Sequence, residues 1–127
     1  MEPIFKIIAI EGGIWKAASI ERQPSTTLVD WSVYEIKLES ESVRTRHFVG
    51  RSVEPGYHGR TSSAVRSFDA KTAQGVTRSS RVYRLKGRPG SHPDANYTWQ
   101  MWLEINPATD VVDVTQEILQ SMQEASA

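Results

Sequence analysis

Residues 28–38 read LVDWSVYEIKL, and this stretch decides the fold. Its β-branched and aromatic residues alternate with polar ones, which is typical of a strand with one buried face. The alternation changes parity midway: the first apolar set is Val29, Trp31 and Val33, and the second is Tyr34, Ile36 and Leu38. Successive side chains of a strand point to opposite faces, so the two sets face different surroundings. We therefore predict a bulge or a change of packing partner near Val33.

The same kind of periodicity predicts further strands on both sides of this stretch. The expected strands cover residues 4–10, 14–22, 43–49, 64–68 and 77–86. Turns separate them, and the first turn contains Gly12 and Gly13, which suit a tight hairpin. In the strand expected at 77–86, Arg84 and Lys86 share one face and Arg81 takes the other.

Two helices are expected after the last strand. The first begins at Ser91 or Asp94, carries Pro93 in its first turn, and ends before Pro107. Its apolar stripe contains Trp99 and Trp102, which we expect in the core. Asp113 caps the second helix, and its buried stripe is Val114, Ile118, Leu119 and Met122.

The order of these elements predicts the fold class. Strands first and helices last indicate an α+β fold with a mostly antiparallel, curled sheet of about five or six strands. The two C-terminal helices are expected to pack on one face of that sheet. A length of 127 residues predicts a single domain covering residues 1–127.

Several kinds of chemistry are excluded or disfavoured by composition. The chain has no cysteine, which excludes disulfides, thiolate zinc sites and cysteine nucleophiles. The three histidines, His47, His58 and His92, are widely spaced and form no metal-binding pair. Ser62 and Ser63 lie near His58, but no acid is placed to orient that histidine as a base. We expect a non-catalytic protein with no cofactor and no metal.

The N-terminal residues predict where the protein acts. The apolar run at residues 4–10 is interrupted by Lys6 and is too short for a signal peptide or a membrane span. We therefore expect a cytoplasmic protein without a membrane partner.

The net charge of zero conceals a strong segregation of charge. Residues 1–42 carry four basic and seven acidic side chains, net −3, and residues 43–92 carry eleven basic and two acidic ones, net +9. Residues 93–127 carry six acids and no Lys or Arg, net −6. Such asymmetry between segments is typical of a protein with an electrostatic partner.

The basic segment supplies the candidate binding residues, with interleaved side chains that could stack or donate hydrogen bonds. They are Arg44, Arg46, Tyr57, His58, Arg60, Arg66, Arg78, Arg81, Arg84, Lys86 and Arg88. If strands 43–49 and 77–86 are near neighbours, their cations form one patch suited to nucleic acid or an acidic protein surface. The alternative is that these arginines pair with the thirteen acids outside the segment.

Part of the chain also resembles known proteins. The resemblance is carried by residues 59–64 (GRTSSA), Phe68-Asp69, residues 75–90, Asp94-Ala95, Tyr97, Trp99, Trp102 and residues 113–115. This set, spanning residues 59–115, resembles small uncharacterised proteins of proteobacteria that are associated with plasmids, integrative elements and prophages. The sequence departs from that pattern at Ser80, where Gly often follows Thr-Arg-Ser. No catalytic motif comes with the resemblance.

Three functions follow as hypotheses from charge and resemblance. The first is a small non-catalytic binding protein of a mobile element that acts on a protein or nucleoprotein complex of the host, as anti-CRISPR proteins do. The second is direct nucleic-acid binding through the Arg-rich segment 44–88. The third, an enzyme using the loop at residues 57–63, lacks a complete set of catalytic groups.

Overall fold

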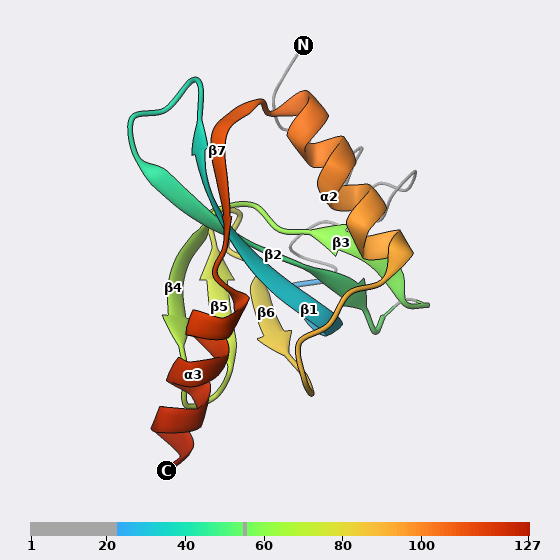
Figure 1. Ribbon diagram of the computed structural model, residues 1–127. Coiled ribbons are helices and arrows are strands. Elements are labelled where there is room, and N and C mark those ends of the chain that lie inside the picture. Colours follow the sequence, from blue (N-terminus) through green and yellow to red (C-terminus); the bar gives the residue numbers. More distant parts are fainter. Residues whose placement is uncertain (1–22, 55) are drawn as a thin grey trace.

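The computed structural model describes residues 23–54 and 56–127. These residues form seven strands and two helices (Figure 1). The strands are β1 (Ser25–Leu38), β2 (Arg44–Ser52), β3 (His58–Thr61), β4 (Val65–Asp69), β5 (Gln74–Thr77), β6 (Val82–Leu85) and β7 (Ala108–Asp113). The helices are α2 (Pro93–Ile105) and α3 (Thr115–Ser126). The strands expected at residues 4–10 and 14–22 lie outside the described residues.

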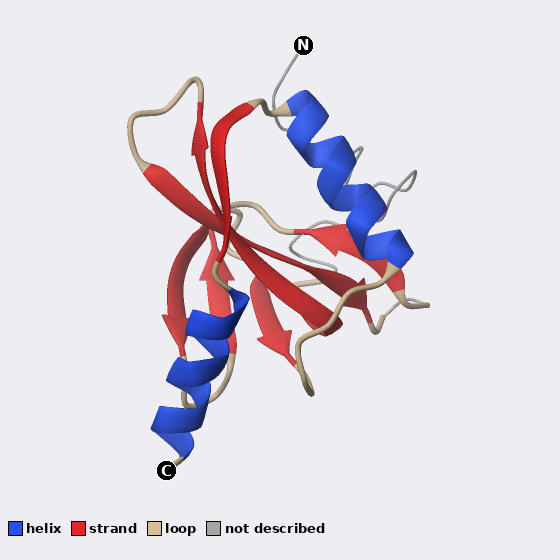
Figure 2. Ribbon diagram, viewed as in Figure 1, coloured by secondary structure: helices blue, strands red, loops and turns tan. Residues whose placement is uncertain are grey.

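All seven strands belong to one unclosed sheet with the order β3-β2-β1-β6-β5-β4, and β7 pairs separately with β1 (Figure 2). One edge of β1 pairs antiparallel with β2. The other edge pairs with two strands in turn. The first part of β1 pairs with β6, which is the only parallel pairing among the described strands, and the last part pairs antiparallel with β7. The α+β class, the mostly antiparallel sheet and the two C-terminal helices are thereby confirmed.

Strand β1 has a bulge near its start, but the change of apolar parity after Val33 is a change of packing partner, because the register with β2 is regular from Ser32 to Lys37. The register with β2 shifts between Val29 and Ser32, and Asp30 within this interval has a left-handed φ of 50°. Asp tolerates this conformation better than most residues. The Asp30 carboxylate accepts hydrogen bonds from Arg51 Nε and Nη2 at 2.9 and 2.7 Å. The bulge precedes its predicted position, so Leu28, not Val29, is buried in the same cluster as Trp31.

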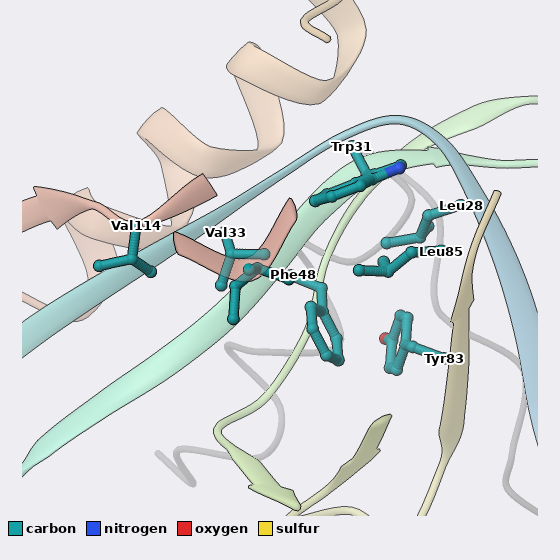
Figure 3. Packing of buried hydrophobic residues seen from close by; sticks show 8 residues of the cluster. Leu28, Trp31, Val33, Phe48, Tyr83, Leu85 and Val114 are labelled. Atoms are coloured by element: carbon teal, nitrogen blue, oxygen red, sulfur yellow. The ribbon is translucent and has the colours of Figure 1, made fainter. Parts of the chain in front are cut away.

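One face of β1 and β2, here called the Phe48 face, points into the curl of the sheet. Trp31, Val33 and Phe48 pack there against Tyr83 of β6, and all four side chains are at most 1% exposed (Figure 3). Full burial of each such side chain stabilises the fold by about 1.5–3 kcal/mol. Helix α3 and its N-cap residue cover this cluster. The residues that pack there are those predicted for the buried stripe of the second helix: Val114, Ile118, Leu119 and Met122.

The opposite face of the two strands, here called the Val49 face, carries the second core cluster. Ile36 and Val49 pack there against Ala95, Trp99 and Trp102 of α2. The two tryptophans are 5% and 2% exposed, which confirms that they belong to the core. The two helices therefore cover opposite faces of β1 and β2, which differs from the expected single face. The parity change in β1 is the reason, because it aims one apolar set at each helix.

The strand expected at residues 77–86 is wrong, because the chain reverses direction inside it. Strand β5 ends at Thr77 and β6 begins at Val82, with Ser80 N–H donating to Thr77 O at 2.8 Å between them. Ser80 has a φ of 74°, the left-handed region that favours glycine.

Strands β3, β5 and β7 were not expected from the sequence, and the caps of the helices differ from the predicted ones. Strand β3 covers His58–Thr61, β5 overlaps the strand expected at residues 77–86 only at Thr77, and β7 lies between the two helices. The first helix is capped by His92, whose Nδ1 accepts from Asp94 N–H at 3.1 Å. The N-cap of α3 is Val114, which makes no side-chain capping hydrogen bond, and the predicted cap Asp113 lies one residue earlier, where its carboxylate accepts from Thr115 N–H at 2.9 Å.

Gly59 offers a test of how closely β3 approaches α2. A Cβ at Gly59 would lie 2.2 Å from the backbone oxygen of Asp94, whereas one at Gly90 would lie 3.5 Å from its nearest neighbour, Asp30 Cα. We expect Gly59→Ala to destabilise the protein by about 2 kcal/mol or more, because backbone cannot yield as a side chain does. Gly90→Ala should change stability by less than about 0.5 kcal/mol. Equal urea-unfolding midpoints for the two variants would contradict this packing.

Candidate functional site

The predicted binding residues do not form one patch. Strand β1 lies between β2 and β6, so the two cation-bearing strands are not neighbours. The cations instead divide into three groups: those paired with carboxylates on β2, those buried in the curl, and those exposed around β4 and β6.

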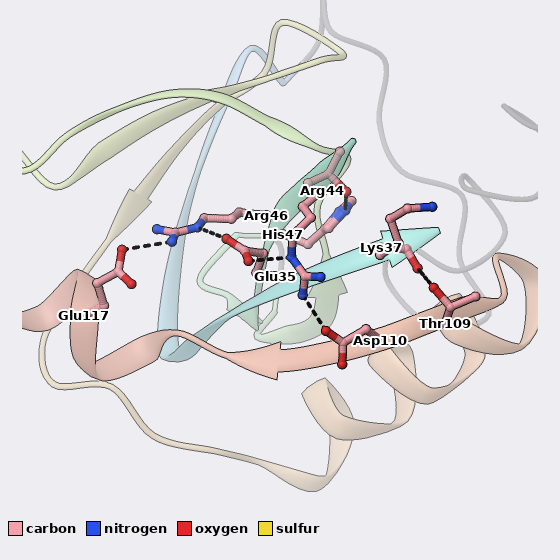
Figure 4. Close-up of polar contacts among 9 residues, drawn as sticks. Glu35, Lys37, Arg44, Arg46, His47, Thr109, Asp110 and Glu117 are labelled. Atoms are coloured by element: carbon pink, nitrogen blue, oxygen red, sulfur yellow. Dashed lines mark hydrogen bonds and ion pairs between the residues drawn. The ribbon is translucent and has the colours of Figure 1, made fainter. Parts of the chain in front are cut away.

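The paired group forms a network around Glu35 (Figure 4). Its carboxylate accepts from Arg44 Nε at 2.7 Å and from Arg46 Nε at 3.0 Å. Arg44 Nη2 also reaches Asp110 of β7 at 2.9 Å, and Arg46 Nη2 reaches Glu117 of α3 at 2.8 Å. These five residues, here called the arginine network, come from β1, β2, β7 and α3. The network ties the C-terminal acidic segment to the basic strand β2.

The pKa shifts within the arginine network follow from these contacts. The hydrogen bonds from Arg44 and then Arg46 lower the pKa of Glu35 below its ordinary value. The hydrogen bond to Glu35 raises the pKa of Arg44. Burial by itself would lower the pKa of Arg46, but its bonds to Glu35 and Glu117 together raise it. All three groups therefore stay charged at neutral pH.

The buried group is Arg60 and Arg81, which are 4% and 3% exposed. Arg60 Cζ lies 5.8 Å from the centre of the Tyr83 ring, and Arg81 Nε donates to Gln23 O at 3.0 Å. These two predicted binding residues lie inside the fold, so they contribute nothing to an exposed surface.

The exposed group contains Arg66, Arg78, Arg84, Lys86 and Arg88. Arg78 Nη1 lies 3.6 Å from Glu41 Oε2, a long contact. None of the ion pairs found among residues 23–54 and 56–127 involves the other four. Tyr57 is 49% exposed beneath Arg51, whose Cζ lies 5.4 Å from its ring centre, and His58 is half-buried at the start of β3.

Two of these groups meet at a groove between β2 and β4. The groove has a volume of about 380 Å³ and is lined by Glu35, Arg44, Thr45, Arg46, Ala64, Val65, Arg66, Ser67, Phe68 and Arg78. Four arginines and one glutamate are therefore among the residues that line the same space. We call this the arginine groove.

The arginine groove has hydrogen-bonding capacity left for a ligand. A guanidinium has five N–H donors, and Arg44 and Arg46 each use only Nε and Nη2 on the carboxylates of the network. Arg66 and Arg78 lie at the β4 side with weaker or no internal pairing. Planar forks of this kind suit carboxylate or phosphate oxygens. The groove can therefore accept an anionic group.

His47 lies on the Val49 face and is only 2% exposed. Its Nδ1 donates to Ser62 O at 3.0 Å, because a carbonyl oxygen only accepts, and its Nε2 lies 2.8 Å from Thr45 Oγ1. The ring also packs 4.6 Å from that of Trp102. Burial lowers the pKa of His47 from 6.5 to about 4, so the ring is neutral and Nε2 accepts from Thr45.

The hydroxyl of Ser62 is committed to structural hydrogen bonds. Ser62 is fully buried, accepts from Phe48 N–H at 2.9 Å and donates to Ser63 O at 2.7 Å. A nucleophile needs a base to take its proton, and this proton is directed at a backbone carbonyl. Within the described part of the chain, no three His, Asp or Glu side chains cluster in a way that could hold a metal ion.

Comparisons with known proteins add no relative: no family model matches the chain, and neither the curated proteins nor the solved structures yield a match. None of the helices among the described residues has the length and hydropathy to cross a bilayer. The structure thus defines a small α+β domain with an arginine-lined groove between β2 and β4.

Sequence reasoning missed the carboxylates of the arginine network, namely Glu35, Asp110 and Glu117. The alternation of β1 places Glu35 on the face of Val33 and away from Ile36, which is a usable signal. To predict that Glu35 pairs with Arg46, one must know the register of β1 against β2. To predict that Asp110 pairs with Arg44, one must also know the register of β7 against β1. Neither register is written in the local sequence.

His47 predicts a specific dependence of stability on pH. Its pKa is lower in the folded state, so the unfolded chain binds the extra proton between about pH 6.5 and 4, and stability falls as pH drops through this window. A shift of this size corresponds to about 3 kcal/mol. Glu35 has a lowered pKa too, but its contribution is lost only below its ordinary value of 4.5.

We expect His47→Gln, which keeps a donor and an acceptor, to flatten the stability profile between pH 6.5 and 4.5. Urea-unfolding free energies at several pH values in this range measure the effect. Glu35→Gln is the matched control, because it should change the profile only below about pH 4.5. A wild-type profile that is flat above pH 4.5 would show that His47 is not buried in its neutral form.

Proposed function

We propose that this chain is a non-catalytic binding protein that engages an anionic group of a host protein or nucleoprotein complex in the arginine groove. The observation that carries the proposal is that four arginines, Arg44, Arg46, Arg66 and Arg78, line one groove of about 380 Å³.

The balance of charge around the groove determines what kind of partner fits. Four carboxylates of the chain itself, Glu35, Glu41, Asp110 and Glu117, contact three of the groove arginines. An isolated small anion competes poorly with them. A partner surface binds more tightly than a small anion if it makes other contacts besides its anionic group. Phe68 and Val65 offer apolar area for such contacts in the same groove.

The resemblance of residues 59–115 to proteins of plasmids, integrative elements and prophages supports a biological setting for this binding. A compact charged domain in such an element is suited to occupy and disable a host defence complex, as anti-CRISPR proteins do. The proposed role is therefore counter-defence by binding.

Direct nucleic-acid binding is the second candidate, and one observation favours it. Arg84 and Lys86 alternate with buried Tyr83 and Leu85, so both cations lie on one exposed face of β6. Arg88 follows directly and is exposed. Together with Arg66, these residues could contact phosphates along a strand.

Charge reversal separates the arginine groove from the β6 face. We expect the double variant Arg66→Glu, Arg78→Glu to reduce affinity for the host complex by about a hundredfold, because it places two carboxylates in the groove. Arg84→Glu, Lys86→Glu, an equal change of charge on β6, should leave affinity within about threefold. Affinity is measured on the complex recovered with the wild-type protein, after far-UV circular dichroism confirms folding. Equal loss in both variants would contradict a groove-specific site.

Salt titration tests the nucleic-acid alternative directly. Binding of a labelled oligonucleotide should weaken with salt at a log–log slope of about −0.9 per phosphate contacted for a duplex, and about −0.7 for a single strand. No measurable binding of the oligonucleotide at low salt would rule out the second candidate. A steep slope that the β6 double variant reduces would favour the second candidate over the first.

A further inference from the structure

Strand β7 presents one free hydrogen-bonding edge. Val114 N–H donates to Val33 O at 2.9 Å, which fixes the phase of the ladder between β1 and β7. In an antiparallel ladder this orientation alternates, so Val112 and Asp110 turn their N–H and C=O groups toward β1. The backbone N–H and C=O groups of Val111 and Asp113 consequently point away from β1, toward the free edge. In the described part of the chain no strand lies on that side of β7.

The exposure of β7 is unusual for a strand in a sheet. Every residue from Thr109 to Asp113 is exposed, and Val111 and Val112, on opposite faces of the strand, are 42% and 41% exposed. Beside Asp113 lies a cavity of about 450 Å³, lined in part by Tyr34 and Gly90. An open edge carrying exposed β-branched residues is a template for another strand.

We propose that β7 pairs antiparallel with β7 of a second copy of this chain, about a two-fold axis at Val111. In this register Val111 N–H and C=O bond reciprocally to those of the other Val111, and Asp113 lies opposite Thr109. The pairing uses the outward groups of β7 and leaves its ladder with β1 intact. This pairing joins the sheets of the two copies through their β7 strands, and it reduces the exposure of Val111 and Val112.

Charge and backbone conformation select this register over its neighbours. A two-fold axis at Asp110 or at Asp113 would place two like carboxylates directly opposite each other, which destabilises a pair. An axis at Val112 would shift the pairing onto Val114, whose ψ of 17° is not extended. With the axis at Val111, Asp110 lies opposite Val112, and Arg44 already neutralises that carboxylate.

The absence of cysteine from the chain permits a clean cross-linking test. With the axis at Val111, the two Val111 Cα atoms form a hydrogen-bonded pair about 5.5 Å apart, within the range of a disulfide. The two Val112 residues lie diagonally, at about 7–8 Å. We expect full-length Val111→Cys to form a covalent dimer on mild oxidation, and Val112→Cys to remain largely uncross-linked. Preferential cross-linking at position 112 would overturn the register.

Sedimentation of the full chain over a range of concentrations tests the association itself. Val111→Lys sets two like charges opposite each other and should raise the dimer dissociation constant by about fivefold or more. Val112→Lys adds the same charge opposite Asp110 and should not weaken the dimer. A wild-type protein that is monomeric up to about 1 mM would overturn the proposal, leaving the edge for a strand of another protein. A dimer that Val111→Lys leaves unchanged would overturn it equally, because the copies then associate elsewhere.

Discussion

The two-sided apolar pattern of β1 is the constraint on which the rest of the structure depends. The bulge at Asp30 places Leu28 on the Phe48 face together with Trp31 and Val33. Beyond Val33 the register with β2 is regular, so the ordinary alternation of the strand aims Ile36 at α2 on the other face. Arg51 holds the bulge by binding the Asp30 carboxylate. Because β1 then needs a cover on each side, the two helices must separate, and β7 between them reaches the free edge of β1.

The polarised charge of the sequence is largely resolved inside the fold. The acidic residues Asp110 and Glu117, from the C-terminal segment, meet Arg44 and Arg46 of the basic segment around Glu35. Exposed ion pairs of this kind are screened by solvent and contribute little to stability, so the arginine network orients β7 and α3 more than it stabilises them. What survives as unneutralised charge is smaller than the sequence suggests, and it lies near Arg66 and along β6.

The parts of the fold that sequence predicted are those with a strong local period. The alternation in residues 28–38 and the apolar stripe containing Trp99 and Trp102 are local signals, and the structure has both. The turn at Ser80 was not predicted, because its left-handed φ is unusual for serine. Strand β7 was missed since its exposed residues show no buried face. The arginine groove could not be predicted, because it depends on how the sheet curls and brings β4 next to β2.

One ion pair connects the two surfaces of this protein. Arg44 lines the arginine groove and at the same time binds Asp110 on β7. An anion that draws Arg44 away from Asp110 leaves a less neutralised carboxylate on the edge strand. The pair is exposed, with side chains 38% and 55% accessible, so solvent screens it and it couples the two surfaces only weakly. Occupation of the groove and pairing of β7 are therefore close to independent, and each can be altered without abolishing the other.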